Sequence, residues 1–175
     1  REIATQIAIA ALRYFMLKFT KPSVIAFDFK EALSFEGETG PYCQYSLVRA
    51  RSILSRAAAE LGVADVAAAE ALLVAEVADG RIPIEGASLD HWQLVRDLAE
   101  LPGVVEISVE TLELATLARF VHRLAQGFNT FYHQNPVLPE PDPALRRLRL
   151  GLCALFARTM QGALEVLGIE APDRM

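Results

Sequence analysis

The sequence is poor in several features that mark specialised classes of protein. It has only two cysteines among 175 residues, Cys43 and Cys153, which is too few for a disulfide framework and lacks the spacing of a zinc site. Its longest apolar runs, such as residues 7–12, are far shorter than the roughly 20 residues that cross a bilayer. No compact apolar block followed by a cleavage site opens the chain. We therefore expect two packed thiols, no membrane span, no signal peptide and a cytoplasmic location.

Lysine is also scarce, with 3 residues against 14 arginines, and the net charge is -5. Residues 1–59 carry 8 basic and 5 acidic side chains, residues 60–113 carry 2 and 12, and residues 114–175 carry 7 and 5. An acidic middle between mildly basic ends can still present a basic face, and the local field decides whether a polyanion binds. Arginine favours planar, bidentate or stacking contacts. The composition leaves nucleic-acid binding open, with arginines that merely solvate a helix surface as the alternative.

What the sequence has in abundance is apolar residues, at 53% of the chain. This content excludes disorder as the main state, and the length suits one domain with one core. The first residue, Arg1, falls inside a periodic pattern rather than before one. We therefore expect the chain to be a piece of a longer protein.

Helical periodicity dominates, and no pair of strands is evident. The three-and-four spacing of apolar residues predicts helices over residues 1–19, 41–61, 66–79, 89–101, 114–131 and 143–167. The first of these is expected to be mostly buried, and the fourth can continue through Pro102-Gly103 to residue 112. We predict five to seven helices and no sheet, which is an all-α helical bundle.

The connectors have their own signals. Residues 24–29 lean towards extended structure without a partner strand, and Asp28 can cap a short turn over residues 29–35. Four prolines within residues 135–143 mark the clearest connector of the chain.

The helix predicted from Pro41 to Leu61 carries two unlike stripes, at about 100° of rotation per residue. The aliphatic stripe consists of Cys43, Leu47, Ala50, Leu54, Ala57 and Leu61. Roughly 140° away, the aromatic stripe consists of Tyr42, Tyr45, Arg49, Ser52 and Arg56. If the aliphatic stripe enters the core, the aromatic stripe lines a surface or groove, where rings and arginine donors suit an unstacked base of single-stranded RNA. The alternative is that the tyrosines pack against another helix, with their hydroxyl groups hydrogen-bonded.

Other chemistry is weakly supported. The histidines, His91, His122 and His133, are scattered and lack metal-binding spacing. Glu36 and Glu38 flank a glycine in a turn, where a structural role is favoured over an acid–base pair. No phosphate loop and no nucleophile elbow occurs. We expect no catalytic residue, no metal and no cofactor within this segment.

Residues 35–45, Phe-Glu-Gly-Glu-Thr-Gly-Pro-Tyr-Cys-Gln-Tyr, resemble the stretch that opens the anticodon-binding region of arginyl-tRNA synthetases. Similar segments cover the rest of the chain, at residues 11–15, 101–106, 128–132 and 167–175, whereas residues 60–88 are less similar. Asp142 with Ala144-Leu145-Arg146 resembles the Asp-Ala-Leu-Arg signature of this domain class, with Pro143 inserted.

The resemblance implies a bundle of the class I synthetase type and a role in attaching arginine to its tRNA, with ATP and magnesium used by the full-length enzyme. In that family the residues matching Tyr42, Tyr45, Arg49 and Met175 surround the anticodon loop and help read its second base, a cytosine. With Arg56 from the aromatic stripe, they form the predicted RNA-binding set.

The resemblance also implies a division of the chain and its partners. Residues 1–34 would be a stem that follows a catalytic domain, and residues 35–175 the anticodon-binding domain. The expected partner is arginine tRNA, with no DNA and no membrane, and the chain is expected to be a monomer.

Two differences from the family stand out. Ser46-Leu47 follows Gln44-Tyr45 where the family commonly has Ala-His, so any polar contact of that histidine is missing. The His-Ile-Gly-His and Lys-Met-Ser-Lys signatures that hold ATP do not occur, so this segment alone is not expected to make arginyl-adenylate. The alternative function is a non-catalytic, synthetase-derived module that binds a protein through the aromatic stripe.

Overall fold

The computed structural model describes every residue from Arg1 to Met175, and all of its regular structure is helical. Its elements are α1 (Glu2–Leu17), α2 (Phe29–Ala32), α3 (Gly40–Leu61), α4 (Val66–Ala78), α5 (Leu89–Ala99), α6 (Leu101–Thr111), α7 (Ala115–Gln134) and α8 (Pro143–Val166). The all-α bundle predicted from the sequence is confirmed. None of the helices is both long enough and apolar enough to cross a bilayer.

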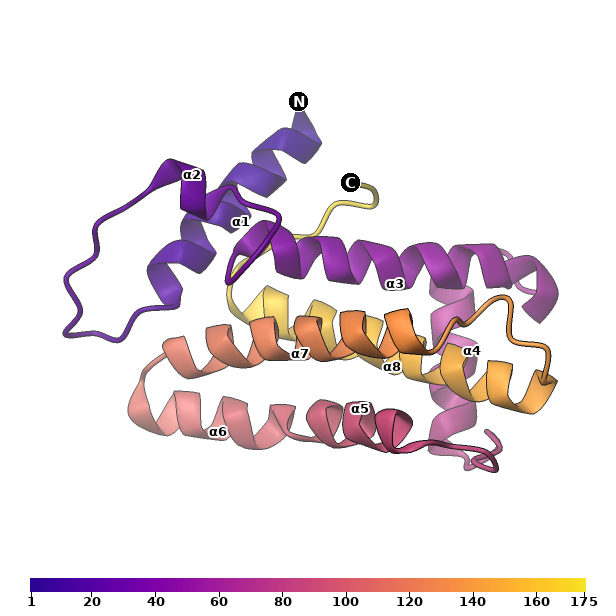
Figure 1. Cartoon of the computed structure of the whole chain (residues 1–175). Helices are drawn as coiled ribbons and strands as arrows, with labels where there is room; N and C mark the ends of the chain where they lie inside the picture. Colours follow the sequence, from indigo (N-terminus) through magenta and orange to yellow (C-terminus); the bar gives the residue numbers. More distant parts are fainter.

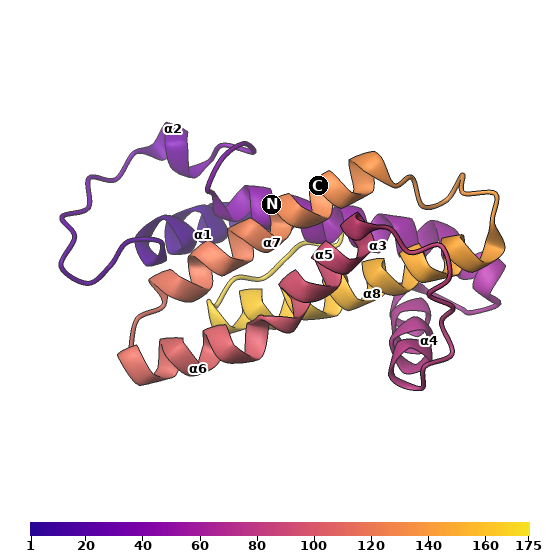
Figure 2. The ribbon, with the colours of Figure 1, turned by 60° about the horizontal axis from the view of Figure 1, so that its bottom comes forward.

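The long helices α3, α7 and α8 run side by side, and each packs against the other two (Figure 1). Helices α5 and α6 lie along α7 on the side away from α3, and α4 crosses one end of the bundle against α3 and α8. Figure 2 shows α2 and the connector of residues 18–28 extending from the opposite end. The helix pair α3 and α7 therefore forms one outer face of the molecule.

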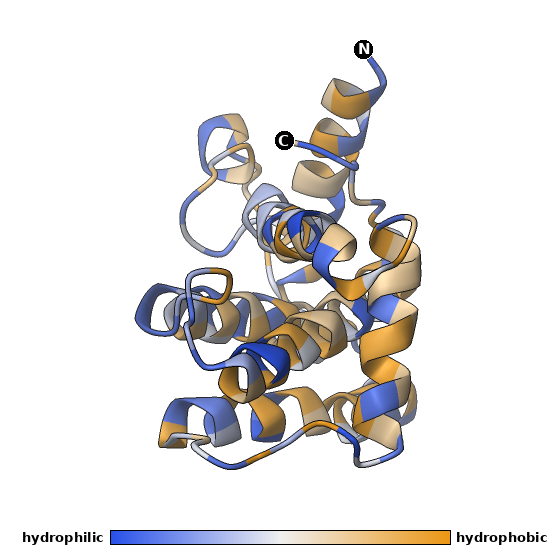
Figure 3. Ribbon diagram, turned by 90° about the vertical axis from the view of Figure 1, so that its right-hand side faces the viewer, coloured by the Kyte–Doolittle hydropathy of each residue, from blue (hydrophilic) through white to orange (hydrophobic).

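One hydrophobic core holds these helices together. At its centre Phe128 of α7 and Phe156 of α8 stack with ring centroids 3.9 Å apart. The aliphatic stripe of α3 enters this core, since Cys43, Leu47 and Leu54 are fully buried. Along their length the helices mix hydrophilic and hydrophobic segments, as expected of elements that bury one face (Figure 3).

The helix α3 begins and ends as its sequence dictates. The Thr39 side chain caps the first turn by accepting a hydrogen bond from the Tyr42 N–H at 3.3 Å, and Pro41 occupies the first turn, where no intrahelical donor is needed. Gly62 ends the helix in the left-handed region at φ 69°.

Helix α1 packs against α3 at a point where the two backbones come close together. Gly40 of α3 lies so close to Ala10 of α1 that a Cβ atom at Gly40 would overlap the Ala10 carbonyl group. The buried Tyr14 hydroxyl donates to the Ala118 carbonyl oxygen of α7 at 2.8 Å.

The expectation that α1 is mostly buried is wrong. Its buried residues are Ala10, Ala11, Tyr14 and Phe15, whereas Ile9, Leu12 and Met16 are exposed. The reason is that only one side of the helix meets α3 and α7.

The helix count is eight rather than five to seven. The turn after Asp28 closes into the one-turn helix α2, because the Asp28 carboxylate accepts hydrogen bonds from two backbone N–H groups. The helix beginning at Leu89 ends at Ala99, and α6 starts anew at Leu101. Pro102 explains this break, because proline has no N–H to donate to a carbonyl oxygen of the preceding turn.

Candidate nucleic-acid interface

The outer face of α3 carries the aromatic stripe, as the periodicity predicts. Tyr45 is 37% exposed, Ser52 and Arg56 are exposed, and Tyr42 and Arg49 are half-buried. The aliphatic and aromatic stripes are thus separated between core and surface. The aromatic stripe lies beside α7, which covers its Tyr42 side and leaves its Tyr45 side open.

Arg49 is held in place between the two helices. Its guanidinium carbon lies 4.8 Å from the centre of the Tyr45 ring and 5.7 Å from that of Tyr132 on α7. One terminal nitrogen donates to the Tyr45 hydroxyl at 3.1 Å, and the other donates to Asn129 Oδ1 at 3.1 Å. An arginine restrained on both sides can present its remaining N–H groups in a defined direction.

Asn129 of α7 joins this cluster from the other side. Its Nδ2 donates to the Tyr42 hydroxyl at 3.0 Å and to Ser46 Oγ at 2.9 Å. Ser46 Oγ in turn donates to the Tyr42 carbonyl oxygen at 3.0 Å. Tyr42 therefore follows the alternative interpretation, a tyrosine packed on a neighbouring helix with its hydroxyl group bonded, whereas Tyr45 follows the interpretation of an accessible ring.

The sequence did not single out Asn129, Ser46 or Tyr132 as site residues. The only signal was that residues 128–132 resemble a family segment. Which face of α7 meets α3 depends on the packing of two helices that are distant in sequence, so the periodicity of either helix alone does not reveal the contact.

His122 completes the α7 side of the interface. Its ring lies beside that of Tyr42, with centroids 5.4 Å apart, and its Nε2 atom is buried without a hydrogen-bond partner. Burial lowers the pKa of His122 below 6.5, while the nearby Glu38 carboxylate acts in the opposite direction. The lowered pKa favours the neutral form of the ring.

Met175 and Arg56 lie apart from this cluster. Met175 lines a hollow of about 560 Å³ on the other flank of α3, together with Val48, Ser52 and residues of α4. The lining of this hollow includes none of the residues Tyr42, Tyr45 and Arg49. Arg56 is exposed about two turns further along α3. The predicted set thus divides into a cluster and two flanking positions.

The difference from the family at position 47 leaves the aromatic stripe intact. Leu47 is 0% exposed and packs in the core on the opposite side of α3. A side chain at this position would contact other core residues and would not reach a ligand on the outer face.

The other acidic and histidine residues considered from the sequence lie apart from this cluster. A Glu38 carboxylate oxygen lies 3.4 Å from the Tyr14 hydroxyl, whose proton is shared with the nearer Ala118 carbonyl oxygen, whereas Glu36 is exposed. His91 is 2% exposed and forms a capping box with Ser88 at the start of α5. Burial and the neighbouring Arg149 charge lower the pKa of His91 below 6.5.

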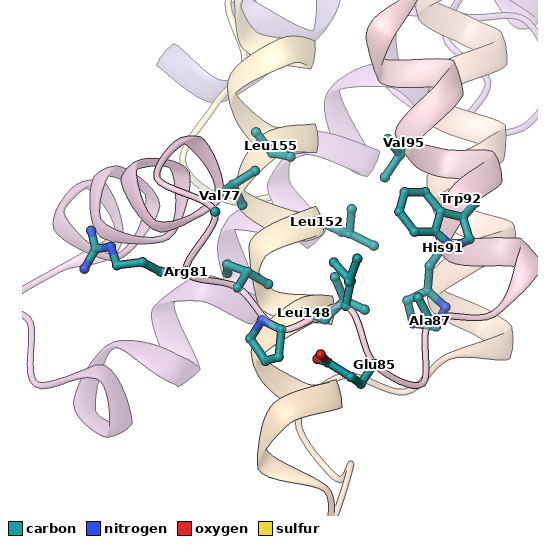
Figure 4. A pocket seen from close by; sticks show the side chains of 14 residues that line it. Val77, Arg81, Glu85, Ala87, His91, Trp92, Val95, Leu148, Leu152 and Leu155 are labelled. Atoms are coloured by element: carbon teal, nitrogen blue, oxygen red, sulfur yellow. The ribbon is translucent and has the colours of Figure 1, made fainter.

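A second hollow, of about 550 Å³, lies between α4, the following loop, α5 and α8 (Figure 4). Trp92 and Val95 of α5 border it on one side, and Val77 and Leu155 on the other. Its charged lining residues are Arg81, which is paired with Asp79 at 2.8 Å, and Glu85. Because no residue of α3 or α7 lines it, this apolar hollow is separate from the interface.

The start of α8 carries the residues that resemble the Asp-Ala-Leu-Arg signature. The Asp142 carboxylate accepts hydrogen bonds from the N–H groups of Ala144 and Leu145, at 2.9 and 3.4 Å. Pro143 occupies the first helical turn, where its missing N–H costs nothing. The inserted proline is therefore compatible with the capping role of Asp142.

Residues 43–175 match the sequence model of a family described as the DALR anticodon binding domain. The chain belongs to this family. Similar curated proteins are arginine–tRNA ligases. That of Clostridium beijerinckii is 34% identical and that of Halorubrum lacusprofundi is 36% identical, each over 99% of this chain.

Solved structures agree with this family membership. Thermus thermophilus arginyl-tRNA synthetase is 35% identical over 99% of the chain and superposes with a TM-score of 0.80. The arginyl-tRNA synthetase of Plasmodium falciparum, at 20% identity, shares the fold with a TM-score of 0.81. The chain spans 28 to 29% of the length of the two curated relatives and 27 to 28% of the two structures.

Proposed function

We propose that this chain binds the anticodon loop of arginine tRNA through the outer face of α3, as part of an ATP-dependent arginine–tRNA ligase. The observation that carries the proposal is the exposed Tyr45 ring with Arg49 held above it, on a domain whose family is described as anticodon-binding. Aromatic rings and arginine planes are the surfaces on which unstacked RNA bases bind.

Arg49 supplies the means of reading a base. Two of its N–H groups bond to Tyr45 and Asn129, which leaves three of the five guanidinium N–H groups for a ligand. The pairing edge of cytosine offers two adjacent acceptors, its ring N3 and its O2, whereas uracil has an N–H at ring position 3. A pair of arginine donors therefore favours cytosine over uracil at the second anticodon position.

The flanking residues extend the proposed surface. Arg56 is exposed without a hydrogen bond or ion pair and can contact a phosphate group of the loop. Met175 offers an apolar surface on the flank of α3 opposite α7, next to Ser52. Tyr42 supports the cluster from its half-buried position.

We further propose that residues 1–34 are the stem that connects to a catalytic domain, and that the ligase acts in the cytoplasm as a monomer without DNA or membrane partners. The histidines, cysteines and carboxylates of this chain gather into no group of three. We propose that the residues that bind ATP and magnesium belong to the catalytic domain of the ligase.

The test is binding of a fluorescent RNA hairpin with the stem and loop of the arginine anticodon, followed by anisotropy. Tyr45→Ala and Arg49→Ala should each weaken binding by about 5- to 150-fold, the equivalent of 1–3 kcal/mol. Arg96→Ala, at an exposed position of α5, is the control and should bind like the wild type. Thermal unfolding of Tyr45→Ala should be nearly unchanged because the ring is exposed, and that of Arg49→Ala should change only modestly because its guanidinium group is half-buried.

The base preference is tested with a second hairpin that carries uracil in place of the second anticodon base. The wild type should bind it more weakly, and Arg49→Ala should lose most of this preference. Equal loss for both hairpins would contradict the base-reading role. Failure of the wild type to bind either hairpin would favour the protein-interaction module instead.

A further inference from the structure

Asn129 of α7 forms hydrogen bonds with three residues of α3 at once. Its two Nδ2 N–H groups are both used, one by the Tyr42 hydroxyl and one by Ser46 Oγ, and its Oδ1 accepts from Arg49. Each side of the amide therefore has a partner of matching chemistry. The reversed amide would point N–H groups at the guanidinium group, donor against donor, so the three partners fix its orientation.

We propose that Asn129 is a positioning residue for base recognition: it sets the direction in which Arg49 presents its free N–H groups, and so determines the preference for cytosine. This inference rests on the proposed anticodon binding. Arginine has many rotamers on a helix surface, and a binding site gains affinity when they are restricted before the ligand arrives.

The geometry explains why Asn129 has this effect on Arg49. Tyr45 lies four residues before Arg49 on the same helix and accepts a hydrogen bond from its guanidinium group. With Tyr45 as the only partner, the guanidinium group would move together with the tyrosine ring. Asn129 holds the other terminal nitrogen from α7, and the bonds to Tyr42 and Ser46 immobilise its own amide. The orientation of the guanidinium plane is thus fixed by contacts with two helices of the bundle, α3 and α7.

A purely structural asparagine would not need this arrangement. The bonds from Asn129 to Tyr42 and Ser46 already connect α7 to α3. The bond to Arg49 adds a contact with a half-buried cation that keeps three unpaired N–H groups beside its bonds to Asn129 and Tyr45. That bond orients a ligand-binding group in addition to any stability it provides.

The experiment compares Asn129→Leu and Asn129→Asp with the wild type, using the cytosine and uracil hairpins. Asn129→Leu removes all three bonds and should weaken binding of the cytosine hairpin about tenfold, with a smaller effect on the uracil hairpin. Asn129→Asp keeps the acceptor for Arg49 and should retain most of the preference. Thr130→Leu, at the adjacent exposed position of α7, is the matched control and should leave both affinities unchanged.

A double-mutant cycle tests whether Asn129 acts through Arg49. In an Arg49→Ala background, Asn129→Leu should cause little further loss of binding, because the group that it positions is absent. Additive losses, or an Asn129→Leu protein with reduced affinity but an unchanged cytosine-to-uracil ratio, would overturn the inference and leave Asn129 a structural residue. If Asn129→Leu does not fold, Asn129→Asp decides whether the inference holds. Loss of the cytosine preference in Asn129→Asp would overturn the inference.

The outcomes separate this inference from the proposed function. A wild-type chain that binds neither hairpin, or binds both equally, refutes the base-reading function and this inference with it. A wild type that prefers cytosine while Asn129→Leu keeps the same preference refutes the inference alone.

Discussion

Tyr42 and Tyr45 are three residues apart on α3, and yet they have different surroundings. The Tyr42 ring lies against His122 and its hydroxyl group accepts a hydrogen bond from Asn129, whereas Tyr45 is open to solvent on one side. Rotation by about 100° per residue predicted that both point away from the aliphatic stripe. This rotation could not show that α7 covers only Tyr42. The covering depends on where α7 packs, and its contacting residue Asn129 lies 87 residues after Tyr42 in the sequence.

Two histidines make the stability of the chain sensitive to mild acid. Burial lowers the pKa values of His91 and His122 in the folded state, so the unfolded chain takes up protons first, near pH 6.5. The free energy of unfolding should therefore fall as the pH is lowered from 7 through 6.5, and level off below the folded-state pKa values. Urea denaturation at a series of pH values measures this slope.

The contribution of one histidine can be isolated. His91→Gln should reduce the dependence of the unfolding free energy on pH between 7 and 5.5, whatever its effect on stability at neutral pH. Gln134→Ala, at an exposed position at the end of α7, removes no titratable group, so it is the control and should keep the wild-type slope. An unchanged slope for His91→Gln would show that this histidine does not couple protonation to folding.

At the scale of the helices, local signals predicted most element ends. Asp28 caps a helix as expected, Thr39 and Asp142 also cap helices through their side chains, and Gly62 ends α3 in the left-handed conformation. The division between α5 and α6 and the one-turn helix α2 were less visible, since each depends on a single turn whose helical hydrogen bonds can form or fail at little cost. The exposure of one side of α1 was missed because its apolar residues lie on most sides, and periodicity cannot tell which of them find a partner.

Substitution of alanine for glycine should change the free energy of unfolding in opposite directions at two positions, one at the contact of α1 with α3 and one on α8. Gly40→Ala should destabilise the fold by about 1–3 kcal/mol, because its Cβ would overlap the backbone of Ala10. Gly162→Ala on α8 should stabilise it by about 0.5–1 kcal/mol, since nothing lies within 4 Å of the added carbon and alanine favours the helix. Urea denaturation of both variants checks the signs, and a neutral Gly40→Ala would mean that α1 moves aside without loss.

At the scale of the whole molecule, part of the acidic excess lies away from the aromatic stripe of α3 or is paired with arginine. Helices α5 and α6 carry four of the twelve acidic residues of the middle segment, Asp90, Asp97, Glu106 and Glu110, and lie on the far side of α7 from α3 (Figure 1). On α4, Glu76 and Glu70 are paired with Arg147 and Arg158 of α8, at 2.6 and 3.4 Å. A net charge of -5 is thus compatible with a locally basic face, as the distribution along the sequence suggested.

This arrangement predicts how RNA binding depends on salt. The logarithm of the association constant for the anticodon hairpin should fall linearly with the logarithm of salt concentration, because contacts to phosphate groups release counterions. Arg56→Ala should reduce the slope by roughly 0.7, the value for one phosphate contact on a single strand. Arg96→Ala should not change it, and a wild-type slope in Arg56→Ala would remove Arg56 from the proposed interface.

Family membership was predictable because its motifs extend over nearly the whole chain, from residues 11–15 to 167–175. The arrangement of the proposed site was only partly predictable. Tyr45 and Arg49 came from the periodicity of one helix, whereas Asn129 required the pairing of two helices, and Met175 required the path of the last residues to the flank of α3. The proposed boundary at residue 34 divides a shared core, since Ala10 and Tyr14 of α1 belong to the main hydrophobic cluster.

The contact between Gly40 and Ala10 has a mechanical consequence. It joins two helices backbone to backbone, with no flexible side chain between them to absorb a small shift. A tilt of α3, if the proposed RNA loop caused one at Tyr45, would therefore be passed to α1 at Ala10 and on to Glu2, which lies eight positions earlier in the same helix. The backbone contact thus couples the orientation of α3 to that of the first turns of α1 without any rearrangement of the core.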